Sequence, residues 1–201
     1  MTANEIITNL SNTSLVSQGI ADLTVPSNVT TLLQLLNMAK DKVAEETLLW
    51  LGGEKVTMVT GTSEYTLSSM PIQIVDVFDS NMNLRPRNSV DSMGYYQVSP
   101  NKLTFNTIQN GLEININYYE TPPDFLIDDE VIINPTLIPA LQFYVAHKAF
   151  EIYKTESAIF TSVEFYKKYK SAIGDFKSTT DSVDVDTVIS MDNKIWKRGI
   201  R

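Results

Sequence analysis

The spacing of apolar residues changes twice along the chain, from helical to strand-like and back. Before residue 54 apolar residues recur at three- and four-residue steps, most clearly at Leu32, Leu36 and Val43, which predicts helices. From 54 to 119 apolar and polar residues alternate in short runs separated by turn residues, which predicts a meander of antiparallel strands. Helical spacing then returns. The pattern therefore predicts an α+β fold, in which an antiparallel β unit is inserted into a helical bundle core.

Four helices are expected, two on each side of the β unit. Their expected ranges are 3–17, 26–51, 137–154 and 157–176. Gly52 and Gly53 are expected to stop the second helix, because glycine readily adopts the left-handed conformation of a helix end. The third helix is apolar around most of its circumference, so neighbouring segments must cover it on nearly all sides. On the fourth helix, the residues expected to share one apolar face are Ile159, Val163, Tyr166 and Ile173.

The pattern divides the chain into four segments. These are the N-terminal helices of the core (1–53), the inserted β unit (54–127), the C-terminal helices of the core (128–178) and an extended C-terminal arm (179–201). In the arm, Val183, Val185 and Ile189 are interleaved with polar residues, and no partner strand is nearby in the sequence. Such a segment can add a strand to another chain.

The composition is that of a globular protein. Hydrophobic residues make up 43% of the 201 residues and charged residues 20%, and there is no cysteine. The longest apolar run, 137–146, is about half of the roughly 20 residues that a bilayer requires. No secretory signal is visible, so a cytoplasm-like compartment is expected. The net charge of −8 opposes sequence-independent binding to phosphate backbones.

Few residues are suited to catalysis. His147 is the only histidine, and with no cysteine present a Cys–His pair or a multi-histidine metal site is excluded. We expect His147 to be a packed or interface residue, and residues 128–130 (Asp-Asp-Glu) to be a solvated connection. No catalytic residue, cofactor or metal site is predicted. A hydrolase centred on His147 is left as an alternative.

The basic residues leave a second functional class open. Lys167, Lys168 and Lys170 are interleaved with aromatic residues, and Arg85 and Arg87, on either side of Pro86, are expected to share one face of a strand. These residues would serve a cytosolic nucleic-acid-handling protein. They also fit a solvated helix face and a charged strand edge that discourages aggregation.

Four stretches resemble the head-to-tail adaptor (connector) proteins of short-tailed bacteriophages. They are TLLQLLNMA at 31–39, GTSEYTL at 61–67 with MPIQIV at 70–75, YVAHKAF at 144–150, and FYKKY at 165–169. The resemblance covers most of residues 28–178. It implies a structural virion protein of the neck, assembled in the host cytoplasm, that forms a ring of usually twelve subunits between portal and tail. The implied partners are the portal protein and tail nozzle or fibre proteins, while packaged DNA passes through the channel without sequence-specific binding.

Two sets of site residues follow. The apolar surface of the third helix predicts a subunit interface of Leu141, Tyr144, Val145, Lys148 and Ile152. The arm is predicted to bind the portal through Val183, Val185, Ile189, Trp196, Lys197 and Arg198, with Trp196 as the anchor.

Overall fold

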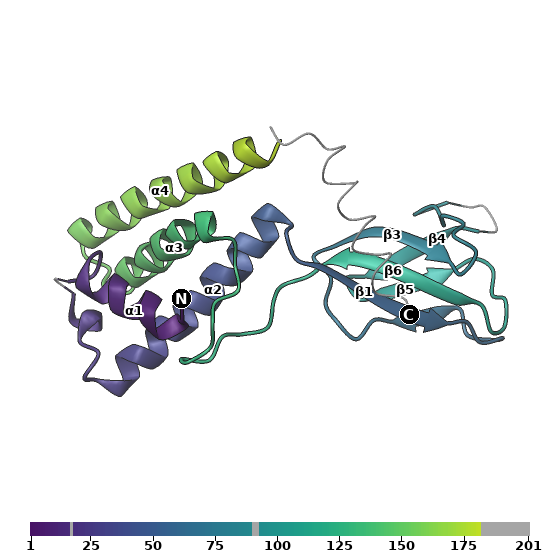
Figure 1. Ribbon diagram of the computed structural model, residues 1–201, viewed down its shortest axis with the longest axis horizontal. Coiled ribbons are helices and arrows are strands. Elements are labelled where there is room, and N and C mark those ends of the chain that lie inside the picture. The colour runs from purple at the N-terminus through teal and green to yellow at the C-terminus, as the bar shows by residue number, and fades with distance from the viewer. Residues whose placement is uncertain (17, 90–92, 182–201) are drawn as a thin grey trace. The chain divides into compact units, whose positions relative to one another are not determined.

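The fold is mixed α+β, as the sequence predicts. The computed structural model describes residues 1–16, 18–89 and 93–181, which hold four α-helices and six strands in two antiparallel sheets (Figure 1). The chain forms two compact units. One unit combines Met1–Ala39 with the described residues from Asp124 onward, and the other is Lys40–Pro123.

The helices appear in the predicted order. Their bounds are α1 (Ala3–Asn12), α2 (Pro26–Thr47), α3 (Ile138–Glu151) and α4 (Glu156–Asp181), with short 3-10 helices η1 (Gly19–Ala21) and η2 (Pro135–Leu137). Helix α2 begins in the first unit and continues into the second, which includes Lys40 and the residues after it.

Helix α1 is fixed at its start by a capping box. The amide of Glu5 donates to Thr2 Oγ1 (3.2 Å), and the amide of Thr2 donates to Glu5 Oε2 (2.8 Å), which satisfies two amides that the helix itself cannot pair. The next amides, of Ala3 and Asn4, donate to backbone carbonyls of the 127–129 segment. The helix ends at Asn12, earlier than predicted.

Helices α3 and α4 are joined by a short connection and lie side by side (Figure 1). Asn134 precedes η2 and accepts the Thr136 amide at 3.1 Å, so the start of the α3 segment is capped. Aromatic rings then interlock between the two helices. The ring centroids of Tyr144 and Tyr169 are 5.1 Å apart. Lys154, in the connection, has a positive φ of 51°, which turns the chain back on itself.

The β unit contains two three-stranded sheets. In the first sheet the strand order is β1 (Leu51–Thr57), β6 (Glu113–Tyr119) and β3 (Gln73–Asp79). In the second sheet it is β2 (Glu64–Thr66), β5 (Lys102–Phe105) and β4 (Tyr95–Ser99). All pairings are antiparallel, but β6 lies between β1 and β3, so the unit is not the simple meander that the pattern predicts. Both sheets contribute to one core, which includes Val77, Leu103, Phe105, Ile114 and Ile116.

The end of α2 differs from the prediction. The helix stops at Thr47, and Leu48 takes the left-handed conformation (φ 51°) and donates its amide to the Ala44 carbonyl at 2.9 Å. The two glycines lie inside β1 instead. A Cβ on Gly52 would come within 2.7 Å of the Glu120 side chain, so close packing against β6 and the residue after it accounts for this glycine.

The predicted start of the arm also changes. Helix α4 extends through Asp181, so residues 179–181 are helical instead of extended. The rest of the predicted arm, 182–201, lies outside the described residues.

The two ends of the β unit are adjacent, as expected for an insertion. Leu51 pairs with Tyr119, and the Glu120 amide donates to the Trp50 carbonyl at 2.9 Å. Lys40, on α2, is only 1% exposed and donates from Nζ to the Pro122 carbonyl at 2.7 Å. The buried ammonium group of Lys40 therefore holds the segment that follows β6 to α2.

We predict that Lys40→Ala lowers the free energy of unfolding by about 2 kcal/mol, because it removes a buried charge-assisted hydrogen bond and leaves the carbonyl without that donor. The matched control is Lys42→Ala on the same helix. Lys42 pairs with Glu45 and Glu46 in a partly exposed setting, so its loss should cost less than about 0.5 kcal/mol. Urea denaturation measures both values, and equal effects would contradict the assignment.

Candidate functional site

The α3–α4 pair carries most of the described residues that bear on function. None of the helices in the described ranges is both long and apolar enough to cross a bilayer. Within the same ranges no three acidic or histidine side chains gather as metal ligands. The acidic segment 128–130 is instead used structurally, because Asp129 Oδ2 accepts the Leu126 amide at 2.7 Å and the Asp129 carbonyl accepts the Ala3 amide at 3.0 Å.

The five predicted interface residues are divided between the core and the surface. Leu141 and Val145 are fully buried within their own chain, so they stabilise the helical unit and offer no surface to a neighbour. Tyr144 and Lys148 are half-buried, with the Lys148 ammonium 5.7 Å from the Tyr144 ring centroid. Ile152, at the end of α3, is 50% exposed. An interface role for these residues stays a prediction, and only the last three have surface to contribute to it.

A larger apolar surface lies on α4. Ile159, Phe160 and Val163 are 54%, 68% and 47% exposed. The sequence predicts that Ile159 and Val163 share an apolar face with Ile173, but of these three residues only Ile173 is buried. Ile159, Phe160 and Val163, the three exposed residues, are called the α4 stripe. The four-residue step from 159 to 163 was visible in the sequence, whereas the side left uncovered depends on where α3 lies.

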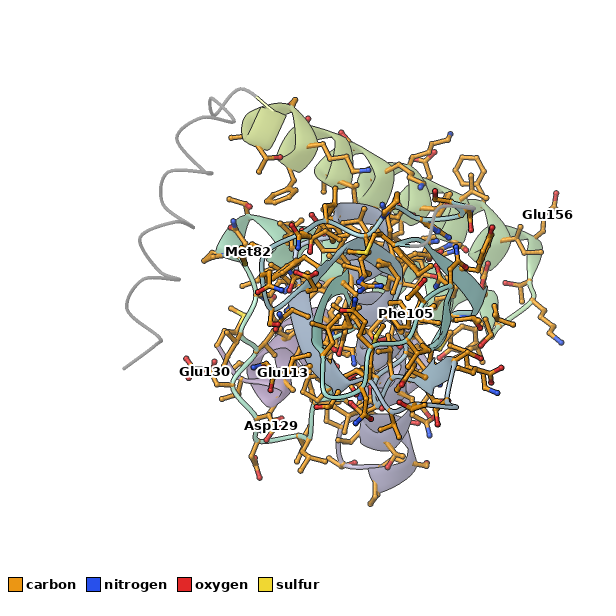
Figure 2. All side chains as sticks on the ribbon, turned by 90° about the vertical axis from the view of Figure 1, so that its right-hand side faces the viewer. Met82, Phe105, Glu113, Asp129, Glu130 and Glu156 are labelled. Atoms are coloured by element: carbon orange, nitrogen blue, oxygen red, sulfur yellow. The ribbon has the colours of Figure 1, made fainter. Side chains whose placement is uncertain are left out.

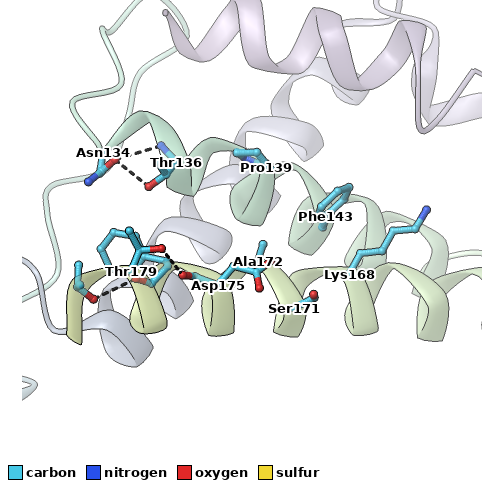
Figure 3. Close-up of a pocket in the computed structure, with 11 residues that line it drawn as sticks. Asn134, Thr136, Pro139, Phe143, Lys168, Ser171, Ala172, Asp175 and Thr179 are labelled. Carbon is cyan, nitrogen blue, oxygen red and sulfur yellow. Dashed lines mark hydrogen bonds between the residues drawn. The ribbon is translucent and has the colours of Figure 1, made fainter. Parts of the chain in front are cut away.

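A groove runs between the start of α3 and the second half of α4. Its volume is about 590 Å³, and Figure 3 shows α3 and α4 side chains facing each other across it. The apolar part of the lining consists of Pro139 and Phe143 on α3 and Ala172 and Phe176 on α4. Lys168 and Asp175 are the charged residues in the lining. This groove was not predicted, because it depends on the register of two helices.

His147 is a packed histidine, as predicted. It is 9% exposed, its Nδ1 lies 2.8 Å from Ser162 Oγ, and the Tyr144 and Tyr166 rings flank it. Burial lowers the pKa of His147, while the hydrogen bond to the Ser162 backbone carbonyl (3.1 Å) and the nearby Glu151 partly oppose that shift. The side chain therefore serves the α3–α4 contact in its neutral form near pH 7.

The lysines proposed for nucleic-acid contact make surface contacts along their own helix. Lys167 lies 3.4 Å from Glu164, and Lys168 stands over the Phe165 ring at 5.0 Å. Lys170 stands over the rings of two tyrosines, Tyr166 and Tyr169, at 5.7 Å from each.

The prediction that Arg85 and Arg87 share one face of a strand is wrong. Arg85 is 2% exposed, and its guanidinium lies 5.8 Å from the Phe105 ring centroid in the β unit. Arg87 is exposed. They lie in the segment between β3 and β4, where Leu84 beside Arg85 bridges to Phe78 and Arg87 itself bridges to Tyr95, so neither arginine belongs to a strand. Arg85 is therefore part of the interior and is not available to a nucleic acid.

The residues predicted to bind the portal are not placed by the structure. Val183, Val185, Ile189, Trp196, Lys197 and Arg198 all lie outside the described residues.

We expect acid to destabilise the protein through His147. Its pKa in the folded chain lies below the ordinary value of 6.5, so the unfolded chain binds the proton more readily. The free energy of unfolding should therefore fall as the pH drops below about 6.5 and through the folded-state pKa. Thermal unfolding between pH 8 and pH 5 measures this, with His147→Gln as the control that should show a smaller loss. An identical pH dependence in both proteins would contradict the role of His147.

The contrast between buried and exposed residues of α3 is also testable. Leu141→Ala should lower the free energy of unfolding by about 2–5 kcal/mol, because it opens a cavity in the core. Ile152→Ala should cost about 1 kcal/mol or less, since half of that side chain is already in solvent. Chemical denaturation of both variants is the measurement, and a larger loss for Ile152→Ala would reverse the assignment of core and surface.

Comparison with known proteins shows the family to which the chain belongs. No curated protein matches the chain. The model of the family described as SU10 adaptor protein matches residues 1–190, which include both compact units. This confirms the resemblance to phage head-to-tail adaptors: the chain belongs to the SU10 adaptor protein family.

Proposed function

We propose that this protein forms a ring of identical subunits in the virion neck, between the portal and the tail. In this role the helical unit acts as a bundle that forms the ring wall, and the β unit stands as an inserted module that can dock tail components. Packaged DNA passes through the ring and is retained there without sequence-specific binding. The protein acts by assembly and carries out no catalysis.

The observation that carries this proposal is the α4 stripe, in a chain that belongs to an adaptor family. The helical unit already buries Leu141, Val145 and Ala146 in its own core. It nevertheless exposes three large apolar side chains within five residues of one helix. Apolar surface that is contiguous and exposed marks a contact with another protein. Family membership points to other virion components as the class of partner.

The charges support a channel through which DNA slides. The net charge of −8 gives no general attraction for phosphates. The lysines of α4 make contacts with Glu164, Phe165 and Tyr166 of their own helix, and Arg85 is buried. These contacts do not favour the alternative of a nucleic-acid-handling protein.

The arm remains our proposed portal contact. Its alternating valines and Trp196 are suited to adding a strand and an aromatic anchor to another protein. Subunit number is also part of the proposal, with twelve expected from the family resemblance.

Electron micrographs of the protein with and without the portal protein of the same phage test the function. We expect a closed ring of this chain on the portal. A chain ending at Asp181 is the matched variant, because it keeps all of α4. It should retain the helical circular dichroism signal and fail to join the portal. A protein that stays a single copy under all these conditions, with no complex on the portal, would contradict the proposed function.

A further inference from the structure

Ile159 and Val163 of the α4 stripe lie on one flank of the helix and the groove lies on the other, while Phe160 lies between them on the side away from the buried face. Successive residues of an α-helix are rotated by about 100°. Counted this way from the buried Tyr169 and Ile173, residues 159 and 163 are displaced to one side and the groove residues 168 and 172 to the other. Both features belong to the same compact unit, so each copy carries one apolar projection and one apolar depression.

The two surfaces match in size and chemistry. The groove volume of about 590 Å³ is within the range of roughly 300–1,000 Å³ of pockets that hold drug-sized ligands, so it has room for more than one side chain of the stripe. Its apolar lining includes Pro139, Phe143 and Phe176. The stripe presents Phe160, which is 68% exposed and is the most exposed of the three stripe residues. An aromatic side chain entering such a depression is a common form of interface anchor.

The charges around the two surfaces also match. Glu156 and Glu164 are exposed on either side of the stripe. The groove carries Lys168, and it also lies beside Asn134 and Thr136, where the positive end of the α3 helix dipole begins. The acid in the groove lining, Asp175, is a counterpart for Lys167, which follows the stripe.

We propose that the α4 stripe of one copy docks in the α3–α4 groove of the next copy. This inference rests on the proposed function, because it names the contact by which the ring forms. A contact between two different surfaces is heterologous, and it produces either a closed ring or an open filament. In a closed ring each stripe and each groove is occupied once. A second copy is therefore the occupant that covers both exposed surfaces with one interaction.

The absence of cysteine in the natural chain allows a direct cross-linking test. Phe160→Cys marks the stripe, and Ala172→Cys marks the groove. Ring assemblies on the portal are prepared from each variant alone and from an equal mixture of the two variants. All of them are treated with a short bismaleimide. In the control mixtures the Lys55→Cys variant takes the place of either Phe160→Cys or Ala172→Cys. Lys55 lies on an exposed part of β1. Circular dichroism confirms that each variant is folded.

The mixture of Phe160→Cys and Ala172→Cys should give cross-linked dimers on the order of tenfold above the control, because a docked pair holds the two thiols at high effective concentration. Each variant alone should stay at the control level. A chain with both substitutions should give a ladder of larger products, since every copy is then linked on both sides.

Two results would overturn the inference while leaving the proposed function intact. One is a ring in micrographs with no cross-linking of the mixture above the control. The other is efficient cross-linking of Phe160→Cys to itself, which would show a symmetric stripe-to-stripe contact. If no ring forms and no cross-link appears, the proposed function and the inference both fail.

Discussion

The helical unit depends on the packing of α3 against α4. His147 and Tyr169 are buried where the two helices meet, and Nδ1 of His147 reaches Ser162 Oγ at 2.8 Å. Close packing of such large side chains tolerates little displacement, so the relative register of the helices is set by this contact. The register in turn brings Pro139 and Phe143 opposite Ala172 and forms the groove (Figure 3).

A consequence of this packing is that the two flanks of α4 differ. Figure 2 draws the described side chains of the chain and labels Glu156, the first residue of α4. The stripe flank exposes apolar side chains with acids before and after them in the sequence, and the other flank forms the groove and carries Lys168. A symmetric pair of copies would place like surfaces together, whereas a head-to-tail contact joins unlike ones. The chemistry of the flanks therefore fits the proposed head-to-tail contact better than a two-fold dimer.

The sequence was sufficient for the order of the elements and for the existence of α3, since periodicity reports spacing directly. It was not sufficient to predict which side of α4 is buried and which is exposed, because the spacing of Ile159 and Val163 is the same whether α3 or solvent covers them. The prediction that Gly52 stops the second helix is wrong for a similar reason, since its close approach to Glu120 depends on the pairing of β1 with β6. The burial of Arg85 over Phe105 likewise depends on residues distant in sequence.

A high-resolution reconstruction of the protein assembled on the portal, with the side chains of neighbouring copies resolved, tests the proposed contact. We expect Phe160 of one copy to lie against Ala172 and Phe143 of the next, with Glu164 near the neighbour's Lys168. A reconstruction in which the stripe meets another stripe, or in which stripe and groove both face solvent, would contradict it.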